Sequence, residues 1–108
     1  MAKAPTHAPT PVHPGAILDA QLDHLYRQNI LPRAEVAERL GVSSTVLDNL
    51  LTGKTSMTPS MAMRLERLLG APTAAEWMAS QAAYDLWKAE PAMASMLAAI
   101  KPLPKRKR

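Results

Sequence analysis

Cysteine is absent from the 108-residue chain, which removes disulfides and thiolate zinc sites and suits a reducing compartment. A run of the roughly 20 apolar residues that a membrane helix needs is also missing. The first 15 residues contain no apolar stretch of the kind found in a signal peptide. We therefore expect a cytoplasmic protein without a signal peptide or a membrane-spanning helix.

The groups that carry enzyme chemistry are missing as well. His7, His13 and His24 lack the spacing of metal ligands. The sequence shows no paired-carboxylate site, no glycine-rich phosphate loop and no Ser/His/Asp grouping that a small helical body would assemble. We therefore predict that the protein is not an enzyme and holds no metal and no cofactor.

Positive charge is scarce outside the C-terminus, although the net charge is +4. Five of the 13 basic residues lie in the last eight positions, and the other eight face nine acidic residues. The tail, residues 101–108, has two readings. It is a solvated, disordered terminus, which we favour, or it attracts nucleic acid by charge alone.

Apolar residues recur at helical spacing from residue 13 onward, and no strand pattern occurs. Residues 1–12 are rich in proline and poor in large apolar side chains, so we interpret them as a disordered arm. The expected helices cover about residues 16–27, 33–40, 44–52, 59–69 and 73–90, with a sixth short helix over 93–100 as an open alternative. The last long helix is expected to end before Pro91. The sequence thus predicts one all-α domain of five or six helices over residues 13–100.

Residues 32–54 have the pattern of two short helices joined by a tight turn. Ala37 lies where the two helices must pack closely, Gly41 suits a left-handed turn, and Gly53 closes the second helix. This arrangement is a helix-turn-helix, here over about residues 33–52, which places its second helix in the DNA major groove.

The order of motifs along the chain resembles a known family. His13-Pro14-Gly15 opens the first helix, GKTSMTP follows the helix-turn-helix, and EWMASQAAYDL lies in the last long helix. Over about residues 13–88 this is similar to the HigA (VapI-like) branch of the XRE-type helix-turn-helix antitoxins. The resemblance implies a compact lambda-repressor-like helical fold and a type II antitoxin. Such proteins repress their own operon on double-stranded operator DNA, usually as homodimers, and neutralise a HigB/RelE-like mRNA-cleaving toxin.

The resemblance also implies which residues contact DNA. They lie on the polar side of the second helix or flank it: Arg33, Ser44, Thr45, Asn49, Thr52, Lys54 and Thr55. Serine and threonine contact several bases, asparagine pairs bidentately with adenine, and the flanking residues suit phosphates.

Two features depart from the family pattern. Val46 stands where arginine is frequent, and Asp48 lies beside the reading face, where it repels phosphate. A bidentate arginine–guanine contact supplies about 1–3 kcal/mol of discrimination, so we expect weaker or more A·T-directed binding. Arg33 has an alternative role as the partner of Glu35 or Asp48.

Other candidates also have ordinary structural alternatives. Ser44 is either a base contact or, like Ser43, a helix cap. Asn49 is either a base reader, which we favour, or a solvated helix residue. Lys54 would complement the dipole of the preceding helix without any DNA.

Trp77, Gln81 and Tyr84 share one helix face. We expect Trp77 in the core and leave Tyr84 and Trp87 open between core and interface, because aromatic residues are enriched at interfaces. Two alternative functions stay open. One is an XRE-type transcriptional regulator without a toxin, and the other is a protein-binding module that has lost specific DNA binding.

Overall fold

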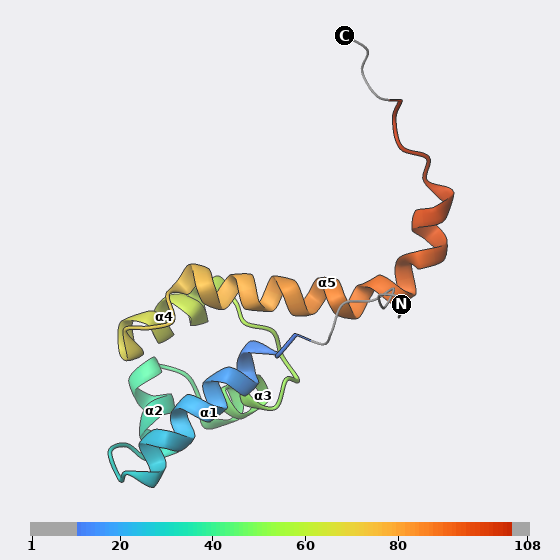
Figure 1. The fold of residues 1–108 in the computed structure, drawn as a ribbon. Coiled ribbons are helices and arrows are strands. Elements are labelled where there is room, and N and C mark those ends of the chain that lie inside the picture. Colours follow the sequence, from blue (N-terminus) through green and yellow to red (C-terminus); the bar gives the residue numbers. More distant parts are fainter. Residues whose placement is uncertain (1–10, 105–108) are drawn as a thin grey trace, which may run out of the picture.

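Five helices make up the computed structural model, which describes residues 11–104 (Figure 1). Their bounds are α1 Pro14–Arg27, α2 Arg33–Leu40, α3 Ser44–Leu51, α4 Pro59–Leu69 and α5 Ala74–Ala99. No strand occurs within the described part of the chain, so the all-α prediction is confirmed. Most of the expected arm, residues 1–10, and the end of the expected basic tail, residues 105–108, lie outside the described residues.

Side-chain caps set the starts of four helices, α1, α3, α4 and α5. The Ser43 Oγ accepts from the Val46 N–H at 3.1 Å, which makes Ser43, rather than Ser44, the cap of α3. Thr58 caps α4 in the same way. At α5, Thr73 and Glu76 form the expected capping box, with bonds of 3.1 and 2.8 Å. These boundaries follow from chemistry within three residues, which explains why the sequence predicts them.

The first helix begins at Pro14, two residues earlier than expected. Its cap is His13, whose Nδ1 accepts from the Gly15 N–H at 2.8 Å, and Pro14 takes the first helical position. Gly15 lies against the backbone of α3. An added Cβ there would sit 1.9 Å from the carbonyl oxygen of Leu50. The HPG motif therefore starts α1 and allows it to touch α3.

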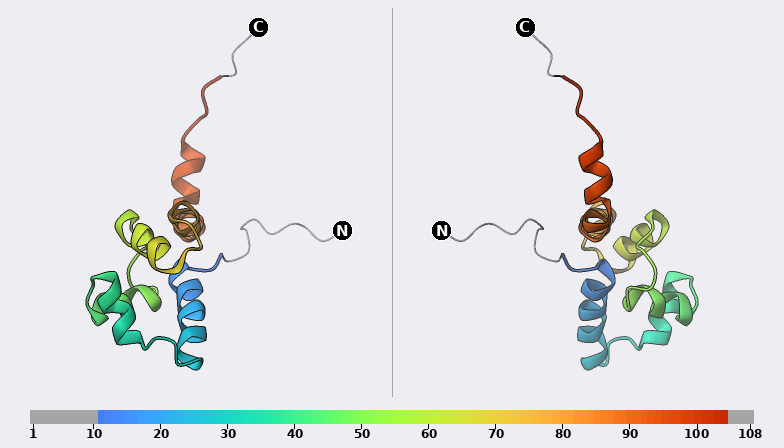
Figure 2. Two further views of the ribbon diagram at one scale, coloured as in Figure 1. Left: turned by 90° about the vertical axis from the view of Figure 1, so that its left-hand side faces the viewer. Right: turned by 90° about the vertical axis from the view of Figure 1, so that its right-hand side faces the viewer.

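The core lies where α1 to α4 meet the first half of α5. Figure 2 looks along α5 and shows α1 to α4 gathered to one side of it. Trp77, 1% exposed, is a core residue as predicted. The buried apolar side chains are Leu18, Leu22, Val36, Ala37, Leu40, Leu47, Leu50, Leu51, Met57, Met61, Ala62, Leu65 and Trp77.

The expected break before Pro91 is wrong, because α5 continues through this residue to Ala99. The axis of α5 changes direction in its last part, which projects away from the other helices (Figure 1). Proline removes one helical hydrogen bond and clashes with the preceding turn, so it bends a helix that it does not end. We call residues 91–104 the distal segment; within it only Met93 is half-buried, and the rest is exposed. None of the described helices is long and apolar enough to cross a membrane.

Candidate nucleic-acid interface

The turn between α2 and α3 is held from two sides. Gly41 has φ +76°, the left-handed conformation expected for it. From α4, the Arg64 Nη1 donates to the Leu40 carbonyl oxygen at 2.5 Å and to the Gly41 carbonyl oxygen at 3.5 Å. The end of α2 and the turn that follows it are thereby fixed to α4. Arg64 was not among the predicted residues, because nothing near it in sequence marks a partner 24 residues away.

One face of α3 packs inward and the other is open. Leu47, Leu50 and Leu51 are buried, whereas Ser44 and Thr45 are exposed. The open face also contains Val46, Asp48 and the half-buried Asn49. Because Ser43 performs the capping, the Ser44 hydroxyl is not needed for it. This face therefore offers hydroxyls, one amide and one carboxylate, and no cation from α3 itself.

The end of α3 wraps back on the helix. The backbone carbonyl oxygen of Asn49 accepts hydrogen bonds from the Lys54 and Thr55 N–H groups at 2.9 and 3.2 Å. Gly53 makes this wrap with φ +79°. The Thr52 hydroxyl donates to the carbonyl oxygen of Asp48 at 2.9 Å, so its proton is used within the helix end. The side chains of Lys54 and Thr55 are exposed beside the open face of α3.

Arg33, the first residue of α2, joins three elements. Its Nη2 lies 3.4 Å from Asp19 Oδ1 on α1, and its Nη1 lies 3.6 Å from Asp48 Oδ1 on α3. Its guanidinium also stands 5.3 Å above the Tyr26 ring. Contact with Tyr26, together with the two carboxylates, raises the pKa of Arg33 above its ordinary value. Of the two expected carboxylate partners Asp48 is therefore present, whereas Glu35 pairs with Arg39 at 2.8 Å.

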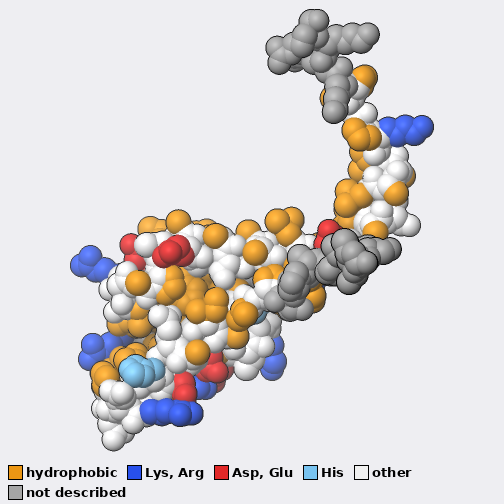
Figure 3. Space-filling view, viewed as in Figure 1, with side chains coloured by type: hydrophobic (Ala, Val, Ile, Leu, Met, Phe, Trp, Pro, Cys, Tyr) orange, Lys and Arg blue, Asp and Glu red, His pale blue; other side chains and the backbone are white. Residues whose placement is uncertain are grey.

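Charges of both signs are mixed over the helical body. Figure 3 shows Lys and Arg next to Asp and Glu side chains on the lower part of the molecule, whereas hydrophobic side chains follow the projecting end of α5. Arg27 is paired with Asp23 at 2.9 Å. On the face drawn in Figure 3, cations are thus accompanied by carboxylates, unlike the strongly basic surface that usually drives DNA affinity.

A buried glutamine ties α5 to the loop after α3. Gln81 is 4% exposed, and its Oε1 accepts from the Met57 N–H at 2.6 Å. Its Nε2 donates to Asp85 Oδ1 at 2.8 Å. This role was not foreseen, although the helix face of Gln81 was. On the same face Tyr84 is half-buried and forms a T-shaped pair with the His13 ring, with 4.9 Å between the ring centroids.

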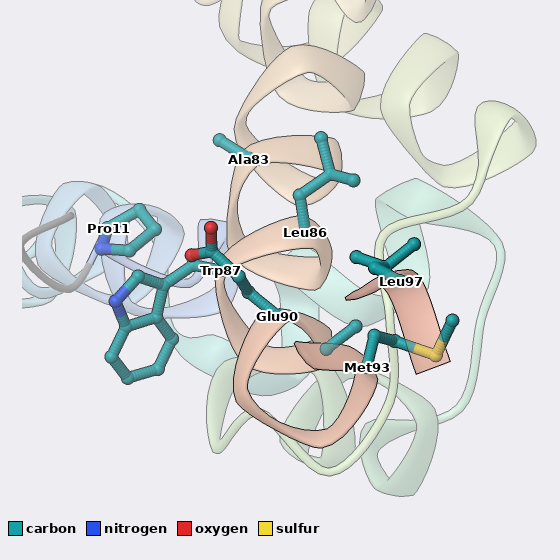
Figure 4. A pocket seen from close by; sticks show the side chains of 8 residues that line it. Pro11, Ala83, Leu86, Trp87, Glu90, Met93 and Leu97 are labelled. Atoms are coloured by element: carbon teal, nitrogen blue, oxygen red, sulfur yellow. The ribbon is translucent and has the colours of Figure 1, made fainter. Parts of the chain in front are cut away.

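The half-buried Trp87 continues this aromatic row, with its ring centroid 6.3 Å from that of Tyr84. It also lines an open groove of about 670 Å³ along α5 together with Pro11, Leu86, Met93 and Leu97 (Figure 4). The groove is mainly apolar, which is typical of a contact surface for another protein.

Comparison with known proteins gives a consistent picture. A helix-turn-helix family model matches residues 25–75. Virulence-associated protein A of Dichelobacter nodosus is 30% identical over 94 residues, which cover 87% of this chain and 89% of that protein.

Two solved structures show the same fold at similar levels of identity. One is an addiction module antidote protein of the HigA family from Coxiella burnetii, with a TM-score of 0.77 and 27% identity over 88% of this chain and 100% of that one. The other is the Pseudomonas aeruginosa antitoxin HigA with the higBA promoter, with a TM-score of 0.73 and 30% identity over 87% of this chain and 99% of that one. The chain therefore belongs to the HigA (VapI-like) family of XRE-type helix-turn-helix antitoxins.

Proposed function

We propose that this protein represses its own operon by placing α3 in the major groove of operator DNA, and that it also neutralises a HigB/RelE-like toxin. The observation that carries the DNA part is the open face of α3. Ser44, Thr45 and Asn49 present hydroxyl and amide groups there, on a helix fixed by its buried leucines and by the turn contact of Arg64. A rigid reading helix holds donors and acceptors in register with base edges.

The position of each side chain decides whether we propose that it contacts bases or phosphates. Ser44, Thr45 and Asn49 contact bases, and the exposed Val46 suits a thymine methyl group. Because α3 has no arginine, the preferred half-site is rich in A·T pairs.

Phosphate contacts come from around the reading face. Arg33 lies before it, and Thr52, Lys54 and Thr55 lie after it. Since the Thr52 proton is bonded within the helix end, its hydroxyl contributes to DNA contact only as an acceptor, and phosphates offer no donor. Arg33 and Lys54 are therefore the two main phosphate ligands, and Thr52 is the weakest of the seven candidates.

We further propose that the protein acts as a homodimer. A dimer would place two copies of α3 about one DNA turn, roughly 34–36 Å, apart. The apolar surface of α5 supports this, because Leu86 and Leu97, which line the groove of Figure 4, are 73% and 51% exposed. Met96, also on α5, is 59% exposed. Large exposed apolar groups on one helix are costly to leave in water and mark an association surface.

The test of the operator function is a salt series on two duplexes of equal length, one from upstream of the gene and one random. We expect preference for the upstream duplex, and we expect that preference to survive removal of residues 101–108. Binding that ignores sequence and disappears with the tail would favour the second candidate, a protein-binding module. The carboxylate of Asp48 beside Arg33 is the specific observation in favour of that candidate.

Asn49→Ala and Lys54→Ala separate base reading from phosphate contact. Loss of a bidentate base contact lowers discrimination by about 1–3 kcal/mol, so Asn49→Ala should relax preference at one base-pair position. Lys54→Ala should weaken binding to both duplexes and reduce the salt slope by about one. An equal loss on both duplexes for Asn49→Ala would remove it from the reading face.

The toxin part of the proposal has its own test. A small basic protein encoded next to this gene should co-purify with the chain and should cleave mRNA only when released from it. If the neighbouring gene encodes no such protein, the XRE-type regulator without a toxin is the better description.

A further inference from the structure

Two carboxylates from different helices form ion pairs with Arg33, which lies next to the reading face of α3. Asp19 comes from α1, outside the helix-turn-helix, and Asp48 comes from α3 within it. Each reaches one terminal nitrogen of Arg33, at 3.4 and 3.6 Å. The guanidinium is thus bound on both sides while it lies over the Tyr26 ring.

The same terminal nitrogens are the ones that a DNA phosphate would bind. Guanidinium binds phosphate and carboxylate in the same geometry, so the two acids compete directly with DNA for Arg33. All three side chains are about half exposed, at 48% for Arg33, 50% for Asp19 and 51% for Asp48. Ion pairs this exposed are weak, so a well-placed phosphate can displace them.

We propose that Asp19 and Asp48 act as positioning residues that set the specificity of DNA binding. On random DNA, Arg33 stays with its carboxylates, and the protein makes one phosphate contact fewer. On the operator, base contacts by α3 place a phosphate beside Arg33, and this phosphate replaces the two carboxylates as the partner of the guanidinium. The inference rests on the proposed operator function and adds to it a reason why a body with few cations discriminates against random DNA.

Asp23 provides a matched control for Asp19. It lies one turn further along α1, its side chain is 51% exposed, and it pairs with Arg27 rather than Arg33. Asp19→Asn and Asp23→Asn therefore remove the same charge from the same helix at the same exposure. The general gain in DNA affinity from losing one negative charge is similar in both variants. The difference in affinity between them therefore measures the effect of the Asp19–Arg33 ion pair.

The experiment measures binding of the full chain to the upstream and random duplexes across a salt series. Relative to Asp23→Asn, Asp19→Asn should bind random DNA about two- to five-fold more tightly, the size expected for an exposed ion pair. Its salt slope on random DNA should steepen by about 0.9, as for one added phosphate contact. On the upstream duplex, the two variants should have the same affinity and the same salt slope. The ratio of upstream to random affinity is therefore lower in Asp19→Asn than in Asp23→Asn.

A second comparison ties the effect to the guanidinium. In an Arg33→Ala background, the difference between Asp19→Asn and Asp23→Asn should vanish, because no cation remains for Asp19 to hold. Circular dichroism of each variant checks that the helices are intact. Asp48→Asn should act in the same direction as Asp19→Asn, although it also alters the reading face.

The outcomes separate the inference from the function on which it rests. If the unmodified chain shows no preference for the upstream duplex, the operator function fails, and this inference fails with it. If the preference is present but Asp19→Asn and Asp23→Asn behave alike on random DNA, only the role of the carboxylates is overturned. A difference that persists in the Arg33→Ala background overturns it as well.

Discussion

The two tryptophans of α5 divide the molecule into two regions. Trp77 is 1% exposed and sits in the core that unites all five helices. Trp87, ten residues later on the same helix, is only half-buried and lines the open groove. The same helix is thus part of the folded core at one end and a surface for association at the other.

The difference extends to how each region is stabilised. In the body, caps, a backbone contact at Gly15 and long-range bonds from Arg64 and Gln81 fix the helices to one another. In the distal segment, Ile100 and Leu103 are 61% and 90% exposed. An isolated helical end is marginal in water, so burial against a partner would stabilise it further. Substitutions in the body should therefore affect folding, and those in the distal segment should affect association.

The largest expected effect compares the tryptophans directly. Trp77→Ala should lower the free energy of unfolding by about 3–5 kcal/mol, because it leaves a large cavity in the core. Trp87→Ala should cost clearly less, because the groove around Trp87 is already open to solvent. Chemical denaturation of dilute protein checks both values, and equal losses would show that the groove belongs to the core.

Gly15 and Gly70 test a close contact against backbone strain. Gly15→Ala should destabilise by about 3 kcal/mol, at the upper end for overpacking, because its Cβ would lie 1.9 Å from the Leu50 carbonyl oxygen. Gly70 has φ +85° and no heavy atom within 4 Å of an added Cβ. Gly70→Ala should therefore cost only the strain of its positive φ, about 1–3 kcal/mol. A milder effect at Gly15 than at Gly70, in thermal or urea unfolding, would contradict the packing of α1 on α3.

Local chemistry explains what the sequence predicts well. Ser43, Thr58 and Thr73 each bond to a backbone group three residues ahead, so their positions mark helix starts. Gly41 takes the left-handed conformation that its place in the turn demands. These signals mark the starts of α3, α4 and α5 and the turn between α2 and α3, and hence the helix-turn-helix and its reading face.

Contacts between residues far apart in sequence explain what was missed. Arg64 bonds to the turn 24 residues before it, and Gln81 bonds to Met57 across the same separation. Neither partner can be identified until the helices are placed in space. Asp19 is the clearest case in the candidate site, because it lies on α1 and reaches Arg33, at the start of α2, only once the two helices are placed in space. The continuation of α5 through Pro91 was missed for a different reason, since proline can bend a helix without ending it.

Gln81→Met tests how the body holds α5 to the loop after α3. The change keeps a side chain of similar size but leaves the Met57 N–H without its buried acceptor, which costs about 1–3 kcal/mol. Asp85→Asn is the matched control, since its retained oxygen still accepts from Gln81 and should cost far less. Hydrogen exchange should show faster opening of the loop after α3 in Gln81→Met. If exchange there is unchanged, α5 does not hold this loop.

The smallest effect on folding, and the largest on association, is expected in the distal segment. Leu97→Lys places a charge on an exposed apolar position beside the groove, so the monomer should lose less than about 0.5 kcal/mol of stability. Dimer dissociation should increase about tenfold or more, because a buried charge at an apolar contact is costly. Ser95→Lys adds the same charge to the same helix at a polar, exposed position and serves as the control. Sedimentation velocity measures dimer dissociation in the two variants. Equal dissociation would place the dimer contact away from Leu97. Loss of the dimer in Leu97→Lys alone would assign association to the outer end of α5.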